Sequence, residues 1–272
     1  MASERIRVLV TVKAAPEPSN TYIDTVCVAG VRVDADRREW VRLYPVPFRH
    51  LSTDQQFKKY DVVEVDTLPA KNDTRHESRR PIWETLRVTG NVKQKAARER
   101  VLSAVSGPSM CELIAGVHAD RDAQSLGLVH VADFDRLTIS KHKGWTPSQQ
   151  RAVESAVAQP ALFGESDAAR KPLQPPRFVV KIRYRCDADS CAGHEPSLLD
   201  FELSALQHRL RNLADDDLRT RIEQKFAVEQ FTPDQRTSLF VGNIADPPKR
   251  RSFSALGIHR VPLASDWGSA LF

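Results

Sequence analysis

Apolar residues recur at every second position near the start of the chain, at Ile6, Val8, Val10 and Val12. This period is typical of a strand with one buried face. Further short strands are predicted at residues 22–33, 40–44 and 61–66. Turns rich in proline or charge separate them. Short strands at this spacing favour a small barrel or a strongly bent sheet.

Helical spacing replaces this pattern after residue 90. Apolar residues recur with a helical period over residues 94–105. Thr146, Pro147 and Gln149 predict a helix start, with threonine as N-cap and glutamine completing a capping box. Pro160 ends that helix, because proline cannot continue the hydrogen-bond ladder.

The last hundred residues or so mix the two periods. Residues 178–186 alternate like a strand, and leucines recur at helical spacing from Leu199 to Leu213. A second helix is predicted at 217–228, and two more strands at 238–241 and 253–261. The predicted fold class is therefore α+β.

These patterns divide the chain into parts. We expect a β-rich, barrel-like domain at residues 1–90, a helical or mixed segment at 91–163, and an α+β domain at 177–272. The polar, proline-rich stretch 164–176 is the predicted linker between the last two.

The most specific chemical signal lies between Cys186 and His194. Cys186, Cys191 and His194 offer two thiolates and one imidazole on a short polar loop. Zinc selects these ligands, and Gly193 eases the turn that brings the histidine inward. The sequence therefore predicts a metal-stapled loop.

A structural metal site needs a fourth ligand from elsewhere in the chain. Cys111 is the first choice, because it follows Pro108 in a stretch that resembles a loop. The predicted cofactor is zinc, with an iron–sulfur cluster as the alternative. In the simpler interpretation, Cys186 only ends a buried strand and the other two decorate a loop.

Composition and charge limit the expected binding partners and cellular location. The net charge is +5 and the isoelectric point about 9.1, which favours a polyanionic partner, although 35 acidic residues lie among 40 basic ones. No apolar run approaches the roughly 20 residues that span a bilayer, and the N-terminus lacks a signal-peptide pattern. We expect a cytoplasmic protein without membrane contact, in which four cysteines are free or metal-bound.

Basic residues recur beside aromatic ones, as in Trp40-Val41-Arg42 and Lys141-His142-Lys143-Gly144-Trp145. This composition is typical of surfaces that bind single-stranded nucleic acid or its backbone. The predicted contacts are the stripe of Lys181, Arg183 and Arg185 on one strand face, and Arg75, Arg79 and Arg80 in the charged segment 73–80. In the plainer interpretation, the rings are core anchors and the charges face water.

Catalytic signals are weak. Glu77 lies in the charged segment, and Asp200 and Glu202 follow the cysteine loop. Two residues apart on a helix means roughly 200° of rotation, so Asp200 and Glu202 can share a site only if the helix begins after Glu202. No glycine-rich phosphate loop, metalloprotease helix or nucleophile elbow is present.

The sequence thus predicts a nucleic-acid-binding protein with a structural zinc site, in a nucleic-acid-processing system. Two other classes stay open. One is a metal-dependent hydrolase of nuclease type, which uses the cysteine loop or the charged segment. The other is an interaction subunit whose basic stripe meets an acidic protein.

Overall fold

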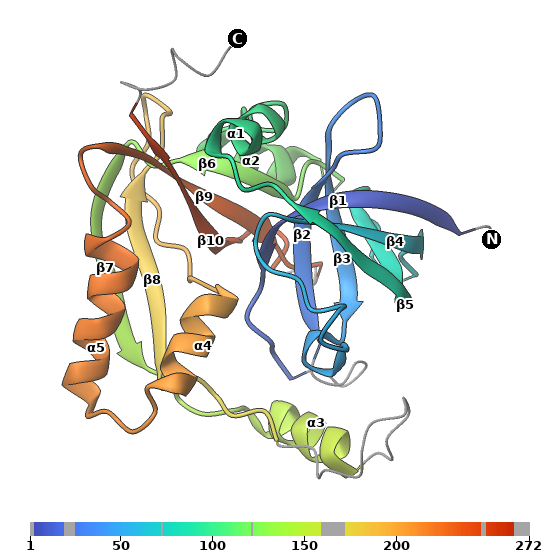
Figure 1. Cartoon of the computed structure of the whole chain (residues 1–272). Helices are drawn as coiled ribbons and strands as arrows, with labels where there is room; N and C mark the ends of the chain where they lie inside the picture. Colours follow the sequence, from blue (N-terminus) through green and yellow to red (C-terminus); the bar gives the residue numbers. More distant parts are fainter. Residues whose placement is uncertain are drawn as a thin grey trace.

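Five strands in the N-terminal part of the computed structural model close into a barrel (Figure 1). They are β1 (Glu4–Lys13), β2 (Val26–Arg32), β3 (Glu39–Val46), β4 (Asp61–Pro69) and β5 (Ser78–Asn91). The structure describes residues 3–18, 25–71, 73–120, 122–158, 172–245 and 249–263. Residues 164–171 of the predicted linker lie outside these ranges.

The strand order around the barrel is β1-β2-β3-β5-β4, and β1 and β4 pair to close it. β3 and β5 run parallel at Arg42 and Ser78, whereas the other pairs are antiparallel. A five-stranded barrel with these connections has the topology of the OB fold. The barrel-like N-terminal part predicted from the sequence is therefore confirmed.

β5 was not predicted. Its burial is irregular, since only Ser78, Pro81 and Leu86 of its 14 residues are buried. The neighbouring β4 alternates buried and half-buried residues over most of its length, which is why its period is visible. β5 is held by pairing with two partners rather than by an apolar face. That pairing leaves no periodic signal in the sequence.

The rest of the chain contributes five strands and most of the helices. A three-stranded sheet has the order β10-β9-β6, and a separate two-stranded sheet joins β7 to β8. The bounds are β6 (Leu126–His130), β7 (Asp133–Lys141), β8 (Phe178–Arg185), β9 (Gln235–Asn243) and β10 (Phe253–Pro262). The predicted α+β class is confirmed. Strands of the middle segment pair with C-terminal strands, and the domain limits stay predictions.

The helices mostly begin near the predicted places. They are α1 (Lys95–Leu102), α2 (Met110–Ala119), α3 (Pro147–Ala158), α4 (Phe201–Arg209) and α5 (Asp215–Glu223), with a short helical turn η1 (Phe48–His50) and a π-helical turn η2 (Gln224–Val228). α2 was not predicted. None of the helices in the described ranges is long and apolar enough to cross a membrane.

The outer face of β2 and β3 packs against the C-terminal sheet. Trp40 of β3 meets Phe240 of β9 edge to face, with ring centroids 6.3 Å apart, and its indole nitrogen donates to the Val105 carbonyl. Ala29 and Val31 of β2 belong to the same apolar cluster. OB folds use this face to bind oligonucleotides. Here most of it is covered by the chain itself.

Close approach between β1 and β2 makes one glycine of the barrel necessary. A Cβ at Gly30 would lie 2.4 Å from the Val8 side chain and 2.5 Å from the Leu9 carbonyl oxygen. We predict that Gly30→Ala destabilises the fold by about 1–3 kcal/mol, measured by urea unfolding. Gly90→Ala, whose Cβ meets nothing within 4 Å, is the control and should shift stability by under about 0.5 kcal/mol. Equal losses of stability in Gly30→Ala and Gly90→Ala would contradict a steric requirement for glycine at position 30.

Candidate functional site

Three cysteine sulfurs and one histidine nitrogen meet at a single point. The Cys186 sulfur lies 3.7 Å from that of Cys111 and 3.6 Å from that of Cys191. His194 Nε2 lies 3.3–3.4 Å from all three sulfurs. Ligands around a tetrahedral zinc ion, with bonds of about 2.0–2.3 Å, are separated by roughly 3.5–3.8 Å. The group can hold a metal ion.

Distant elements place these ligands. Cys111 lies in the first turn of α2, which a capping box between Ser109 and Glu112 holds in place. Cys186 directly follows β8, and two backbone hydrogen bonds between Tyr184 and His194 fold the loop back onto that strand. The structure brings together the four predicted residues. Cys111 lies on a helix, however, and not in the predicted loop.

The protonation of the group favours a bound cation. Burial would raise the pKa of the Cys186 thiol, but hydrogen bonds from the backbone of Ala188 and Cys111 and from His194 lower it to about 6. Burial and the neighbouring thiols raise the pKa of Cys111 to about 12. Three thiolates cannot share this space without positive charge between them, and a metal ion supplies that charge.

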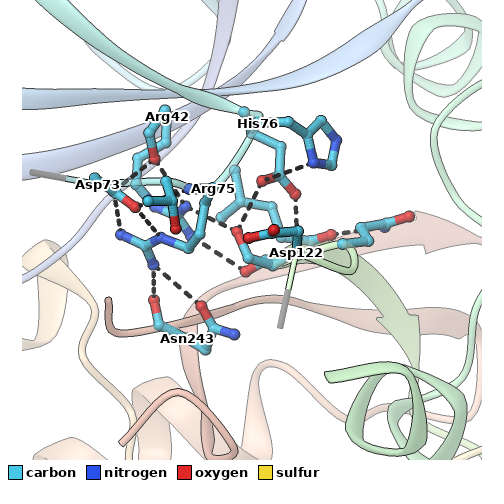
Figure 2. A network of polar contacts seen from close by, with 12 residues as sticks. Arg42, Asp73, Arg75, His76, Asp122 and Asn243 are labelled. Carbon is cyan, nitrogen blue, oxygen red and sulfur yellow. Dashed lines mark hydrogen bonds and ion pairs between the residues drawn. The ribbon is translucent and has the colours of Figure 1, made fainter. Parts of the chain in front are cut away.

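The charged segment 73–80 is mostly used inside the molecule. Arg75 is only 6% exposed, and its guanidinium binds the Asp73 carboxylate and the carbonyl and side-chain oxygens of Asn243 (Figure 2). Burial would raise the pKa of Asp73, but Arg75 and Ser78 lower it to about 2. Arg75 therefore fastens the barrel to β9 through these contacts, and its predicted role in binding nucleic acid stays a prediction.

Glu77 has a similar internal role. Its side chain is buried and accepts hydrogen bonds from the backbone nitrogen of Ser125 (2.7 Å) and from the Ser125 hydroxyl (3.0 Å). Arg42 donates to the same hydroxyl and to the Ser125 carbonyl. Glu77 is thus buried against Ser125, where it helps to hold the barrel to the C-terminal part, and its catalytic role stays a prediction.

Two arginines of the predicted basic stripe on β8 form ion pairs with the neighbouring strand β7. Arg183 pairs with Asp135 at 3.1 Å, and Arg185 pairs with Asp133 at 2.7 Å. The Lys181 ammonium lies in the field of Glu195. Each pair is exposed and therefore weak, and Asp135 also pairs with Arg136, so the acidic residues reduce the positive field of the stripe without removing it. The sequence could not show which acidic residues face the stripe.

A larger positive feature lies at the margin of the covered barrel face. We call it the interface cleft. It encloses about 590 Å³ between the loop after β1, the loop after β4, and the ends of β9 and β10. Its charged lining residues are Glu17, Arg42, Lys71, Asp73, Arg75 and Arg80. Among the described residues of this lining, four cations stand against two carboxylates, a formal charge of +2, with Arg75 and Asp73 already paired to each other.

Two polar atoms of the interface cleft lack partners within the described ranges. The Arg80 Nε atom and the Thr25 hydroxyl are buried and make no hydrogen bond there. Thr25 is 9% exposed. An unsatisfied buried donor costs about 1–3 kcal/mol, so both atoms favour a ligand. Arg80 was predicted, whereas Thr25 was missed, because only the fold brings these loops together. Arg79 instead donates to the carbonyl oxygens of His76 and Ser78.

Asp200 and Glu202 line a second hollow, which we call the lysine cleft. It encloses about 350 Å³ between β1, the segment before β4, α4 and Lys225. Asp200 is the N-cap of α4, with extended backbone, and accepts from the Glu202 nitrogen at 2.7 Å. Both carboxylates reach one cleft because Asp200 precedes the helix. The rotation of about 200° between residues two apart on a helix therefore does not separate Asp200 from Glu202.

Burial gives Asp200 an unusual titration. It raises the pKa of this carboxyl to about 6, although the nearby Lys59 ammonium and the Glu202 amide act in the opposite direction. The folded protein therefore holds a proton here that the unfolded chain has already released.

A family model described as Domain of unknown function (DUF8757) matches residues 106–270, more than half of the chain. The chain belongs to this family. In this DUF8757 protein, a second model, Domain of unknown function (DUF8758), matches residues 4–104, which hold the barrel and α1. No curated protein sequence matches the chain.

Several solved structures are similar to this DUF8757 protein at 9% identity. One is a murine DNA-binding protein bound to double-stranded DNA (TM-score 0.32, covering 96% of this chain and 97% of that one). Another is the p204 HINb domain (0.31, 94% and 95%). A third is a Replication Protein A heterotrimer bound to single-stranded DNA (0.36, 97% and 50%). TM-scores this low leave the function to be argued from the chain itself.

The metal group generates a first prediction. We expect about one metal ion per chain in the purified protein, and its loss together with a lower melting temperature in Cys191→Ser. Cys27→Ala is the matched control, because Cys27 lies outside the metal group and this variant should keep the full metal content. Elemental analysis and thermal unfolding measure both. Unchanged metal content in Cys191→Ser would contradict the site.

The buried Asp200 generates a second prediction. Its folded pKa of about 6 lies above the ordinary value of 3.8, so its stabilising contribution is full below about pH 4 and is lost as pH rises through 6. Asp200→Asn keeps the capping oxygen without the charge. This variant should exceed the native protein in stability by up to about 3 kcal/mol near pH 7.5, and by much less near pH 4.5.

Urea unfolding at both pH values measures this difference. Glu84→Gln, which neutralises an exposed carboxyl on β5, is the control and should change stability by under about 0.5 kcal/mol at either pH. A pH-independent difference between Asp200→Asn and the native protein would refute the assignment.

Proposed function

We propose that this protein binds single-stranded nucleic acid in the interface cleft, while a zinc ion in the Cys111, Cys186, Cys191 and His194 group has a structural role. One observation carries the proposal: a positive cleft lies between the β1–β2 loop and the β4–β5 loop of an OB-type barrel. OB folds bind oligonucleotides between these two loops.

The chemistry of the cleft suits a nucleotide. Arg80 supplies a guanidinium that can reach a phosphate, and Tyr44 supplies an aromatic ring in the same wall. Leu199 and Leu256 add apolar surface to the same lining. A volume of about 590 Å³ lies within the roughly 300–1,000 Å³ of ligand-sized pockets. This size favours one or two nucleotides rather than a long stretch of strand.

The covered face of β2 and β3 limits the binding mode. Because the C-terminal sheet packs there through Trp40 and Phe240, a strand cannot run along it as it does on an open OB fold. We therefore propose that the strand enters at the margin, with a nucleotide inserted into the cleft. Insertion of a nucleotide into the cleft favours single-stranded over double-stranded nucleic acid, because the bases of a single strand are already unpaired.

Zinc is the metal we propose for the cysteine–histidine group. Sulfur atoms 3.6–3.7 Å apart leave room for one ion among them rather than a cluster of several irons. Four protein ligands leave no coordination position for water, so the group gives no support to the hydrolase alternative. Thiolate ligands need a reducing compartment, which fits the proposed cytoplasmic location.

Arg80→Gln tests the binding proposal. Because a hydrogen bond to a charged group contributes about 1.5–3 kcal/mol, we expect this variant to bind a labelled single-stranded oligonucleotide at least about tenfold more weakly. Fluorescence anisotropy at several salt concentrations measures it, and the slope of affinity against salt should fall by about 0.7 for each lost phosphate contact.

Arg183→Gln is the matched control, since it removes an arginine that pairs with Asp135 outside the cleft. Its affinity should stay within about twofold of the native value. Equal losses in both variants would indicate a diffuse positive surface and overturn the proposed cleft. No binding of any oligonucleotide, together with copurification of an acidic protein, would support the interaction-subunit alternative instead.

A further inference from the structure

The lysine cleft gathers five cations from separate elements. They are Lys13 at the end of β1, Lys58 and Lys59 before β4, Arg209 at the end of α4, and Lys225 in η2. Asp200 and Glu202 are the two acidic residues in its lining, so the formal charge of the cleft is +3. Within the described part of the chain, none of the five cations forms an ion pair with a carboxylate. An anion would relieve this repulsion.

Two of the lysines keep donors available. The Lys13 ammonium donates to the Phe57 carbonyl at 3.0 Å and lies 3.7 Å from the centre of the Phe48 ring. The Lys59 ammonium donates to the Ile258 carbonyl at 2.5 Å. Each ammonium has three donors, so one carbonyl partner leaves others for a ligand. Backbone and rings therefore hold both charges in position beside the cleft.

Partial desolvation of the Lys13 and Lys59 ammonium groups strengthens their attraction to a bound anion. Burial lowers the pKa of Lys13 to about 8, although Glu202, Asp61 and Asp200 act against the shift. Burial also lowers the pKa of Lys59. A cation that has lost much of its hydration gains more from a bound anion than an exposed one does.

We propose that the lysine cleft binds a compact anion with two or more linked phosphate groups. A hollow of about 350 Å³ suits a short chain of phosphates, and positive charges from four separate elements match several phosphates better than one. The inference goes beyond the proposed nucleic-acid binding and does not depend on it.

The anion has two potential sources, because the two clefts adjoin. A bridge between Ala14 and Asp200, with a hydrogen bond from the Ala15 nitrogen to the Leu199 carbonyl, separates them. Lys13 faces one side of this bridge and Ala14 the other. The phosphates can belong to a free polyphosphate or to the phosphorylated end of a strand in the interface cleft. The chemistry at the lysines is the same.

Calorimetric titration of the full chain with inorganic triphosphate tests the site. We expect saturable binding that exceeds that of orthophosphate at equal ionic strength. Lys58→Gln combined with Lys225→Gln should weaken it at least about tenfold, because two of five cations are lost. These two positions are chosen because Lys13 and Lys59 are tied to the core. Lys181→Gln, on β8, is the control and should leave the affinity unchanged.

The proposed site would be overturned if the double variant bound triphosphate as tightly as the native protein does. It would also be overturned if the native protein showed no preference for triphosphate over orthophosphate, because binding would then be nonspecific electrostatic attraction. Arg80→Gln should keep its triphosphate affinity, so failure of the nucleic-acid proposal and failure of this one can be told apart.

Oligonucleotides with a 5′-triphosphate or a 5′-hydroxyl distinguish the two sources. If the native protein binds the 5′-triphosphate strand more tightly than the 5′-hydroxyl strand, and the double variant loses this difference, the ligand is the end of a strand. Equal binding of both strands, with triphosphate affinity still dependent on the lysines, supports a free polyphosphate. Equal weakening of the 5′-hydroxyl strand and inorganic triphosphate in the double variant would show plain backbone contact and would refute a separate site.

Discussion

Apolar contact between the outer face of β2–β3 and the C-terminal sheet organises the whole molecule. Trp40 and Phe240 lie at its centre, and a charged network at its edge joins Arg42 to Ser125 and Arg75 to Asn243 (Figure 2). The apolar part supplies most of the driving force, since burial of large side chains contributes more than an equal number of exposed polar contacts. The hydrogen bonds of the buried Arg42 and Arg75 side chains stabilise the fold chiefly because they avoid an unpaired buried charge. These bonds also fix the position of the barrel relative to the C-terminal sheet.

This contact also decides where ligands can bind. It occupies the surface that an OB barrel otherwise offers to a strand, and two hollows lie at its margins. The interface cleft and the lysine cleft lie on either side of the Ala14–Asp200 bridge. Both are positive because cations from several separate elements outnumber the carboxylates among the described residues of each lining. The proposed binding sites therefore lie in clefts at the margins of this contact and not on an open sheet face.

The cysteine–histidine group plays a comparable role far from the barrel along the chain. It joins the start of α2 to the loop after β8, two segments 75 residues apart between Cys111 and Cys186. A metal ion at this point would close a long loop of chain and stabilise the C-terminal part at small cost in ordered residues. Such a clamp also holds the turn beside Tyr184 and His194 in one conformation.

Local physics was readable from the sequence. The period of two predicted β1, residue type placed three more strands of the barrel, the capping box placed the start of α3, and ligand chemistry selected Cys186, Cys191, His194 and even Cys111. Each of these signals depends on residue type and short spacing, which a single chain displays directly.

Tertiary structure decided the rest. It paired β5 where no period marked a strand, buried Glu77 and Arg75 against distant residues, and set Asp133 and Asp135 opposite the basic stripe. It also placed Asp200 ahead of α4, so that two carboxylates share one cleft. The reason is physical: whether a charged side chain is free or neutralised depends on residues far away in the chain. Only the folded backbone brings those partners within a few ångströms.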